Sequence, residues 1–420
     1  MSDSPCPGEL VGEPCFTLSQ YANGEYAQHT SNTSEIVLQF QPGHHVSLSG
    51  NNTLASQLVS FTMITVNSEN STEIDCDSYR RQYLITNVQN VHISGIDFVH
   101  CGLQIESVVN FIIEKSSFSQ VSDYDALHIR SSSAIIKWCN FSNNTNLPLH
   151  VDNASVEIHH STFVNNKRGR RYPGGGGLLV FNARHRVTII SHCSFVNNSA
   201  HYAGGAIFVK SSLVIQHSSF MNNQVIRDGR GGAIYSVKFF INTISISINQ
   251  SEFINNTVAG EIGEGGAIYV SGYSNNVVSI YRSVIQKNSV PIGQGGAVYV
   301  DGKNSSLSIH RSVIESNSIQ LGSGGAILLG GDSSRILIEK TSLSNNEARG
   351  GGEEYSDIDV VGSGGAIWLS GDNSHFLIEN SSLSENKARR GGAIHTVGLN
   401  IYISISKSIV SKIQQQSVVF

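Results

Sequence analysis

A pair of adjacent glycines followed by an aliphatic residue recurs through the C-terminal half of the chain, and this phrase constrains the fold more than any other feature. The pairs begin at Gly176, Gly204, Gly231, Gly265, Gly295, Gly324, Gly364 and Gly391. Successive starts are separated by 28, 27, 34, 30, 29, 40 and 27 residues. A phrase that returns at this spacing predicts a repeat protein in which each unit is one turn of chain.

A second motif recurs once in each repeat alongside the first. It consists of an apolar residue followed three positions later by Asn, as in Phe253 and Asn256. The residue five positions before the apolar residue is always isoleucine. These isoleucines are Ile136, Ile158, Ile190, Ile215, Ile248, Ile280, Ile309, Ile338 and Ile378. The same frame extends to Ile93, Ile113 and Ile405, which gives about twelve repeats. Apolar residues alternate around each isoleucine, so each repeat is expected to contain a short strand.

Repeats of this length, made of strands and turns without a helical period, predict an all-β solenoid with identical residues stacked in ladders. Glycine accepts the positive φ of a sharp turn, and Asn can pass amide hydrogen bonds from coil to coil. We expect the repeats to occupy residues 86–420. Residues 1–85 do not follow the repeat, and an open coil end exposes unpaired strand edges. We therefore expect them to form an N-terminal cap and irregular first coils.

The fourth residue of each glycine phrase is aliphatic and is expected to face the core. By alternation the fifth residue points the other way. This position is occupied by Val180, Phe208, Tyr235, Tyr269, Tyr299, Leu328, Trp368 and His395. The aromatic members Phe208, Tyr235, Tyr269, Tyr299 and Trp368 are candidate binding residues, because aromatic faces stack on sugar rings or bury against a protein partner. The alternative is that they only pair across strands and stabilise the sheet.

The combination of Gly-Gly-Ala-Ile at 265–268 with Phe-x-x-Asn at 253–256 resembles the repeat of the chlamydial polymorphic outer membrane proteins. That repeat is found in the pectin-lyase-like class of right-handed parallel β-helices, and the resemblance covers about residues 90 to 420. It implies a right-handed parallel β-helix of about twelve coils that serves as a surface domain used in adhesion. It does not identify a ligand.

Two functions remain open. The favoured hypothesis is a non-catalytic extracellular or cell-surface scaffold for adhesion or for recognition of a glycan or a cell-surface protein. The alternative is a polysaccharide lyase or glycoside hydrolase, since these enzymes share the architecture. Its candidate residues are Asp123, Asp125 and His128, in the segment 123–130 that is faintly similar to the paired-Asp strand of polygalacturonases, and Asp152, which is expected to join Asp125 by stacking about one coil later. The other polygalacturonase hallmarks, Asn-Thr-Asp, Gly-His-Gly and Arg-Ile-Lys, are missing from the sequence.

Composition excludes several other classes. A net charge of −5 over 420 residues argues against a basic nucleic-acid surface. No run of 18 apolar residues is present, so no membrane-spanning helix is expected. The sixteen histidines form no His-Glu-x-x-His motif, and neither a metal site nor a cofactor is predicted.

Cysteines and glycosylation motifs bear on the compartment. Cys6 and Cys15 bracket a turn-rich segment and are predicted to form a small disulfide loop. The other four, Cys76, Cys101, Cys139 and Cys193, are dispersed and are interpreted as buried thiols. About eleven Asn-x-Ser/Thr motifs occur, among them Asn140, Asn153, Asn255, Asn304 and Asn380. The first residues lack the features of a secretory signal. We expect an extracellular or cell-surface glycoprotein whose signal lies outside this sequence.

Overall fold

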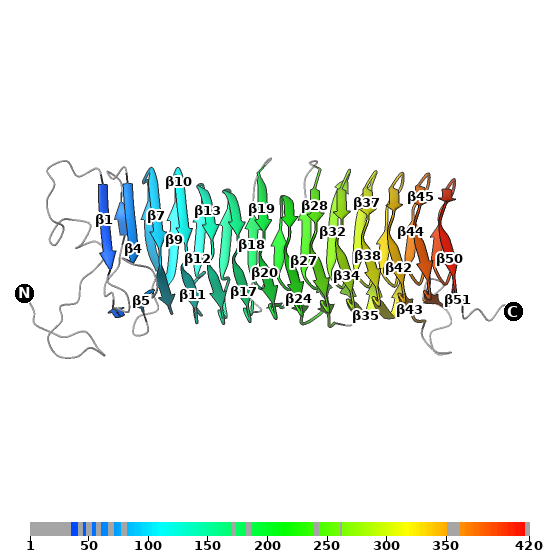
Figure 1. Cartoon of the computed structure of the whole chain (residues 1–420), viewed down its shortest axis with the longest axis horizontal. Coiled ribbons are helices and arrows are strands. Elements are labelled where there is room, and N and C mark those ends of the chain that lie inside the picture. Colours follow the sequence, from blue (N-terminus) through cyan, green and yellow to red (C-terminus); the bar gives the residue numbers. More distant parts are fainter. Residues whose placement is uncertain are drawn as a thin grey trace, which may run out of the picture. The chain divides into compact units, whose positions relative to one another are not determined.

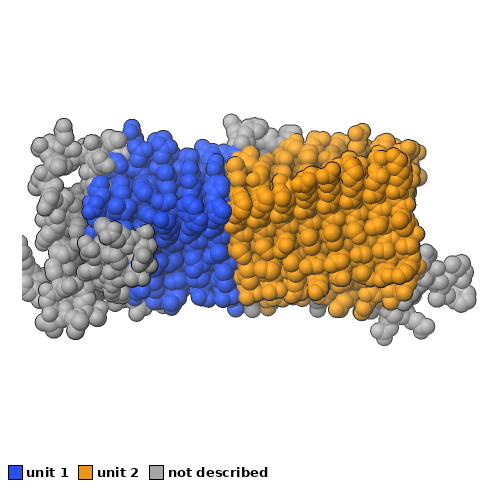
Figure 2. All heavy atoms as spheres, in the orientation of Figure 1, with its two compact units in different colours: residues 1–167, 177–186 blue, residues 168–176, 187–420 orange. Residues whose placement is uncertain are grey.

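The computed structural model describes residues 35–40, 45–47, 53–55, 60–65, 71–76, 82–169, 174–181, 186–238, 243–260, 263–350 and 362–415. The regular elements in these ranges are all β-strands, β1 to β51, and the strands pair in parallel (Figure 1). The chain forms two compact units (Figure 2). Unit 1 is residues 1–167 and 177–186, and unit 2 is residues 168–176 and 187–420. In the described part of the chain, no helix is long and apolar enough to cross a membrane.

Unit 1 contains three parallel sheets, and each coil of chain adds one strand to each sheet. The first sheet consists of β1 (Glu35–Phe40), β4 (Ser60–Thr65), β7 (Asn90–Ser94), β10 (Asn110–Glu114), β13 (Ser133–Lys137) and β16 (Ser155–His159). The second consists of β2 (His45–Ser47), β5 (Thr72–Asp75), β8 (Ile96–Val99), β11 (Ser117–Ser119), β14 (Asn140–Ser142) and β17 (Thr162–Val164). The third consists of β3 (Thr53–Ala55), β6 (Gln82–Thr86), β9 (Gly102–Glu106), β12 (Leu127–Arg130), β15 (Leu149–Asp152) and β18 (Leu178–Phe181).

Unit 2 repeats this plan. Its first-sheet strands are β19 (Val187–Ser191), β23 (Ser212–Gln216), β28 (Ser245–Asn249), β33 (Val277–Tyr281), β37 (Ser306–His310), β41 (Arg335–Glu339), β45 (His375–Glu379) and β49 (Tyr402–Ser406). Its second-sheet strands are β20 (Ser194–Val196), β24 (Ser219–Met221), β29 (Glu252–Ile254), β34 (Val284–Gln286), β38 (Val313–Glu315), β42 (Ser342–Ser344), β46 (Ser382–Ser384) and β50 (Ile409–Ser411). Its third-sheet strands are β22 (Ile207–Val209), β27 (Ile234–Lys238), β32 (Ile268–Ser274), β36 (Val298–Lys303), β40 (Ile327–Leu329), β44 (Ile367–Ser370) and β48 (Ile394–Val397).

A fourth sheet of short strands belongs to unit 2. It consists of β21 (Ser199–Ala200), β25 (Gln224–Val225), β30 (Thr257–Val258), β35 (Ser289–Gln294), β39 (Ser318–Ser323), β43 (Glu347–Ala348), β47 (Lys387–Ala388) and β51 (Gln414–Gln415). Beside it, β26 (Gly229–Arg230) pairs with β31 (Gly263–Glu264), and β31 pairs with β35. The predicted parallel β-helix is therefore confirmed, while its right-handed sense stays a prediction.

The predicted ladders fill the interior of each unit. The isoleucine frame aligns in register, with Ile113 opposite Ile136 in unit 1 and Ile248 opposite Ile280 in unit 2. The phenylalanines of the second sheet stack directly: ring centroids are 4.7 Å apart for Phe141 and Phe163. Burial of these repeated apolar side chains supplies the main stabilisation of the fold.

The asparagines form the predicted hydrogen-bond ladder. Asn256 is fully buried, and its Nδ2 donates to Asn288 Oδ1 at 3.0 Å and to the carbonyl of Phe220 at 2.9 Å. Asn288 repeats the pattern: its Nδ2 donates to Asn317 Oδ1 in the next coil and to the carbonyl of Phe253 in the preceding one. Each buried side chain is therefore hydrogen-bonded to the coils on both sides.

The glycine pair has two distinct structural roles. Gly265 has φ of +65°, a backbone conformation that residues with a side chain rarely adopt. At Gly266, a Cβ atom would lie 2.1 Å from the carbonyl oxygen of Gly296 in the next coil. The first glycine is thus needed for the turn, and the second for the close approach of adjacent backbones.

The assigned frame is wrong at the first pair. Gly176 occupies the place of Gly205, the second glycine of its pair, since its N–H donates to the carbonyl of Gly204 as Gly205 donates to Gly231. Leu179, opposite His150, therefore takes the position expected of Val180. Four consecutive glycines at 174–177 leave the register open in the sequence, and cross-coil pairing decides it.

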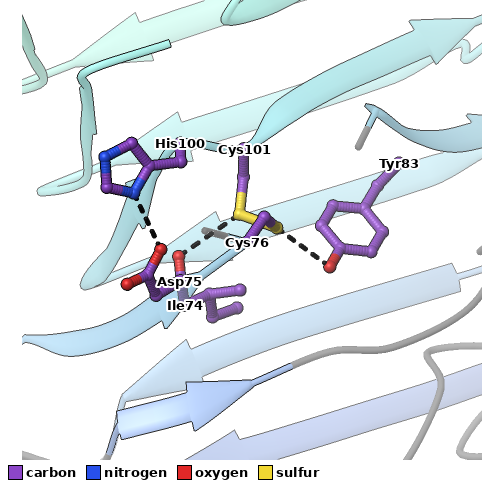
Figure 3. Close-up of a disulfide and its surroundings, with 6 residues drawn as sticks. All are labelled: Ile74, Asp75, Cys76, Tyr83, His100 and Cys101. Carbon is purple, nitrogen blue, oxygen red and sulfur yellow. Dashed lines mark hydrogen bonds and ion pairs between the residues drawn. A yellow bond between two sulfur atoms is a disulfide. The ribbon is translucent and has the colours of Figure 1, made fainter. Parts of the chain in front are cut away.

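The cysteine prediction was half wrong. Cys76 and Cys101 are not thiols but form a disulfide between neighbouring coils, with Cα atoms 5.3 Å apart (Figure 3). Stacking brings together two residues that lie 25 apart in sequence. Cys139 and Cys193 are buried free thiols, as expected. The predicted pair Cys6 and Cys15 lies outside the described residues.

The domain boundary between residues 85 and 86 stays a proposal. Regular strands begin before it: β4 pairs with β7, with Phe61 opposite Val91.

Candidate functional site

The aromatic ladder of unit 2 forms in the predicted register. Tyr235 lies opposite Tyr269, Tyr269 opposite Tyr299, and Leu328 opposite Trp368. These side chains leave the solenoid core and make a separate cluster of their own. The expected solvent-exposed face is nevertheless wrong, because Tyr269 and Tyr299 are only 4% and 9% exposed and Phe208 and Trp368 are buried as well.

The rings cover one another. Ring centroids are 5.0 Å apart for Phe208 and Tyr235, 5.3 Å for Tyr235 and Tyr269, and 5.1 Å for Tyr269 and Tyr299. Tyr235 is partly buried and packs against the cluster. Contacts at these distances stabilise the stack beyond simple area burial. The ladder therefore fits the structural alternative, cross-strand stabilisation, better than an open binding face.

Charged residues of β26 and β31 border this cluster. The guanidinium of Arg230 lies 5.2 Å from the centre of the Tyr269 ring and forms an ion pair with Glu264. Burial raises the pKa of Tyr269 and of Tyr299 well above the ordinary value, and the nearby carboxylates Glu264 and Asp301 raise both pKa values further. The tyrosine hydroxyls are therefore held in their neutral form.

The enzyme candidates of unit 1 lead to a different surface, which we call the polar ladder. It occupies the outward positions of β9, β12 and β15 in the third sheet. One row places Gln104 opposite His128 and His128 opposite His150, and a parallel row places Glu106 opposite Arg130 and Arg130 opposite Asp152. The core-facing neighbours Leu127, Ile129, Leu149 and Val151 are fully buried, which fixes the direction of the polar side chains. The polar ladder consists of Gln104, Glu106, His128, Arg130, His150 and Asp152.

Asp125 joins the polar ladder from the turn before β12. Its Oδ2 lies 2.7 Å from Nδ1 of His150, and the two side chains are 19% and 18% exposed. An ionised carboxylate can only accept, so Nδ1 of His150 carries the proton and donates it to Asp125. The rings of His128 and His150 are parallel, with centroids 4.2 Å apart and an interplanar angle of 3°.

The other two enzyme candidates are placed differently from the expectation. Asp152 stacks on Arg130, not on Asp125: its Oδ2 is 3.4 Å from Nε of Arg130. The reason is register, because Asp125 precedes the strand and Asp152 ends the next one. Asp123 is exposed in the loop before β12 and accepts a hydrogen bond from Ser122 Oγ. It does not take part in the Asp125, His128 and His150 group.

The sequence interpretation missed His150. Its signal was present, since His128 and His150 are 22 residues apart, the same spacing as Phe141 and Phe163. Residues separated by one coil period stack in a β-helix. Applying that rule to polar residues, as was done for the apolar ones, would have found the pair.

Electrostatics distinguish His128 from a solvent-exposed histidine. Burial, together with the neighbouring His150, lowers the pKa of His128 to about 4, although Asp125 and Asp152 oppose the shift. His128 is therefore neutral at physiological pH. The site then holds three carboxylates, Glu106, Asp125 and Asp152, against the one guanidinium of Arg130, a formal charge of −2.

Comparison with known protein families supports the repeat. Residues 192–210 match the family model of the Chlamydia polymorphic membrane protein repeat. This segment contains Phe195, Asn198 and the Gly-Gly-Ala-Ile phrase at 204–207, so the resemblance expected from these motifs is confirmed there. No curated protein sequence matches the chain.

Several solved structures are similar to the chain. A mannuronic acid-specific polysaccharide family 6 lyase from human gut microbiota is 12% identical, with a TM-score of 0.41, over 87% of this chain and 91% of that one. Tailspike protein 3 of bacteriophage CBA120 is 11% identical, with a TM-score of 0.43, over 96% of this chain and 56% of that one. A mutant of the periplasmic alginate epimerase AlgG is 10% identical, with a TM-score of 0.32, over 87% and 85% of the two chains. Similarity at this level carries no inference about the ligand of this chain.

Proposed function

We propose that this protein is a non-catalytic extracellular or cell-surface β-helix that recognises a glycan through the polar ladder of unit 1. The observation that carries the proposal is the in-register array of six polar side chains on three consecutive coils. Planar carboxylate, amide, guanidinium and imidazole groups match the paired hydroxyls of a sugar. Adjacent strands lie about 4.8 Å apart, so the array repeats on the scale of an extended glycan chain.

The charge of the site restricts the class of glycan that can bind. A formal charge of −2 repels acidic polysaccharides and favours neutral or amino-bearing glycans. This charge already includes Arg130, whose guanidinium is shared between Glu106 at 3.6 Å and Asp152 at 3.4 Å. The ligand we propose is therefore a neutral or amino glycan.

The same pairing argues against the lyase alternative. A lyase that cleaves uronate chains must neutralise the substrate carboxylate and abstract a proton beside it. Here the cation of the site is already engaged by two carboxylates. A hydrolase needs two carboxyl groups at a set separation across the scissile bond, whereas Asp125 is engaged by His150 and Asp152 by Arg130.

Three features support an extracellular location. The Cys76–Cys101 disulfide is typical of oxidising compartments. The acceptor asparagines Asn140, Asn153, Asn255, Asn304 and Asn380 are all exposed, as glycosylation requires. The repeat matched at 192–210 is named for a membrane protein family, in agreement with a surface role.

Retention on immobilised neutral, amino and acidic glycans tests the proposal. We expect neutral or amino glycans to retain the wild type, and Arg130→Gln to weaken retention about tenfold by removing a charged hydrogen-bond donor. Arg335→Gln, an exposed arginine of β41, is the matched control and should bind as the wild type does.

Reducing ends and unsaturated products are followed in the same samples. Product formation that is lost in Asp125→Asn would overturn the non-catalytic assignment. Preference for acidic glycans, or equal retention of Arg130→Gln and wild type, would remove the polar ladder as the binding site. Absence of retention on every glycan would direct the search to a cell-surface protein ligand.

A further inference from the structure

The histidine pair of the polar ladder, together with Asp125, has the composition of a metal site. One ligand atom from each of Asp125, His128 and His150 can be chosen so that all three lie within 4.8 Å of one another. Neutral imidazole is a preferred ligand of Zn²⁺ and other first-row transition metals. Among the described residues, no other group of three or more His, Cys, Asp or Glu side chains meets the same criterion.

Two histidine nitrogen atoms of this group also indicate a metal site. Nε2 of His128 and Nε2 of His150 are both buried and have no hydrogen-bond partner among the described residues. A buried polar atom without a partner is costly, and such atoms in a native protein call for an explanation. A metal ion that accepts both lone pairs would supply one.

Asp125 orients one of the two ligands. It accepts the Nδ1 proton of His150, which leaves the lone pair on Nε2. A carboxylate behind a histidine in this way fixes the tautomer and raises the basicity of the metal-binding nitrogen. The negative charge of the site also offsets the charge of a bound cation.

We propose that His128 and His150 bind a divalent transition-metal ion, with Zn²⁺ as the best fit, and that Asp125 completes or supports the site. Ligand atoms of a tetrahedral Zn²⁺ lie about 3.3 Å apart. Binding therefore requires the two stacked rings to rotate so that their Nε2 atoms converge. Two or three protein ligands leave at least one coordination position for water or for a sugar hydroxyl. A bound divalent ion brings the formal charge of the site from −2 to 0, so the charge preference proposed for the glycan holds for the metal-free protein.

A second stacked histidine pair provides a matched control. His192 and His217 of unit 2 have ring centroids 4.7 Å apart and an interplanar angle of 13°. This pair shares the one-coil spacing, but within the part of the chain that the structure describes no carboxylate or further ligand joins it in a group of three. His217→Gln therefore removes a stacked histidine without touching the proposed site.

Titration of the chelator-treated full chain with Zn²⁺, followed by calorimetry without any glycan present, tests the proposal independently of glycan recognition. We expect one ion per chain. His128→Gln and His150→Gln should each weaken binding about 100-fold or more, Asp125→Asn about 10- to 100-fold, and His217→Gln not at all. The wild type loaded with Co²⁺ should show the intense visible absorption of a tetrahedral site.

Circular dichroism establishes whether each variant is folded. If a histidine variant unfolds, the wild type still decides the question through X-ray absorption at the zinc edge of the loaded protein, which should show two imidazole ligands. The metal site would be overturned by absence of stoichiometric binding, by unchanged affinity in the folded His128 and His150 variants, by an equal loss in His217→Gln, or by a zinc shell without imidazole.

Discussion

The outward position of the third-sheet strands is polar on three consecutive strands of unit 1, β9, β12 and β15, and mostly aromatic in unit 2. In unit 1 it carries Gln104, His128 and His150, which remain half-buried and partly accessible. In unit 2 the same strand position carries Tyr269 and Tyr299, which are buried. Alternation along the strand therefore determines the direction of a side chain but not whether solvent reaches it.

The size of the side chain explains the difference. Aromatic rings on four consecutive coils, Phe208, Tyr235, Tyr269 and Tyr299, reach their neighbours, so successive rings cover one another and are largely removed from water. Imidazole and amide groups are smaller and polar, and the side chains of Gln104, His128 and His150 stay half-buried. The two ladders share a backbone geometry, yet one is closed by its own rings and the other stays partly open to solvent.

The largest expected effect is a difference in the free energy of unfolding between variants of the two ladders. Phe208→Ala removes a buried ring from the aromatic ladder and should reduce the free energy of unfolding by about 3 to 5 kcal/mol. Gln104→Ala in the polar ladder should change it by less than about 1 kcal/mol, because its side chain is half-buried and its hydrogen bond to Glu106 is a long one, at 3.3 Å. Chemical denaturation followed by circular dichroism measures both. Equal losses would show that the polar ladder is structural as well.

The cysteines offer the next comparison between the units. Cys101→Ala opens a cross-coil disulfide of unit 1 that closes a 25-residue separation, and should cost about 3 kcal/mol. Cys193→Ala in unit 2 removes a buried free thiol and should cost about 1 kcal/mol. Denaturation of the two variants, and of the wild type with and without reductant, measures the difference. Reductant that leaves the wild type unchanged would contradict the structural role of this disulfide.

Alkaline pH should act on the aromatic ladder. The pKa of Tyr269 and of Tyr299 is raised by burial, so their contribution to stability is fully present below the unfolded value of about 10 and is lost as pH rises above it. At pH 11 each should cost about 1 kcal/mol of the free energy of unfolding. Tyr299→Phe should flatten this dependence. Ultraviolet titration near pH 10 that detected ionisation of both tyrosines in the folded protein would contradict their burial.

The smallest effect concerns binding. Tyr235 is the partly buried member of the aromatic ladder, so Tyr235→Leu should alter glycan retention by less than about twofold if the polar ladder is the binding site. Retention assays on the glycan that binds the wild type measure this, with Arg130→Gln as the positive control. A larger loss than that of Arg130→Gln would return the binding site to the aromatic face.

Much of the fold could be predicted because the same residue types recur at the same positions of successive coils. Ile248, Asn256 and Gly265 each recur at one place in the repeat, and each was assigned the structural role that it has. A ladder of buried hydroxyls was missed: Ser251 N donates to Ser283 Oγ, and Ser283 N to Ser312 Oγ in the next coil. Serine is so abundant in this chain that its periodic members could not be told from the surface ones.

The candidate site was predicted only in part. Asp125 and His128 were identified from local spacing, whereas His150 and Arg130 become relevant only through stacking. Asp123 and Asp152 were grouped with Asp125 because they are near in sequence or one coil away. The exact strand register separates them, and a shift of one or two residues decides which side chains meet.

The sequence by itself determined that this chain winds into parallel coils, because only a repeated backbone path explains invariant glycine, asparagine and isoleucine at fixed offsets. The tertiary structure alone decided which outward residues are open, which cysteines are bonded and which histidines face each other. These properties depend on contacts between residues more than 20 positions apart, and their distances are set by the stacking of coils rather than by any local pattern.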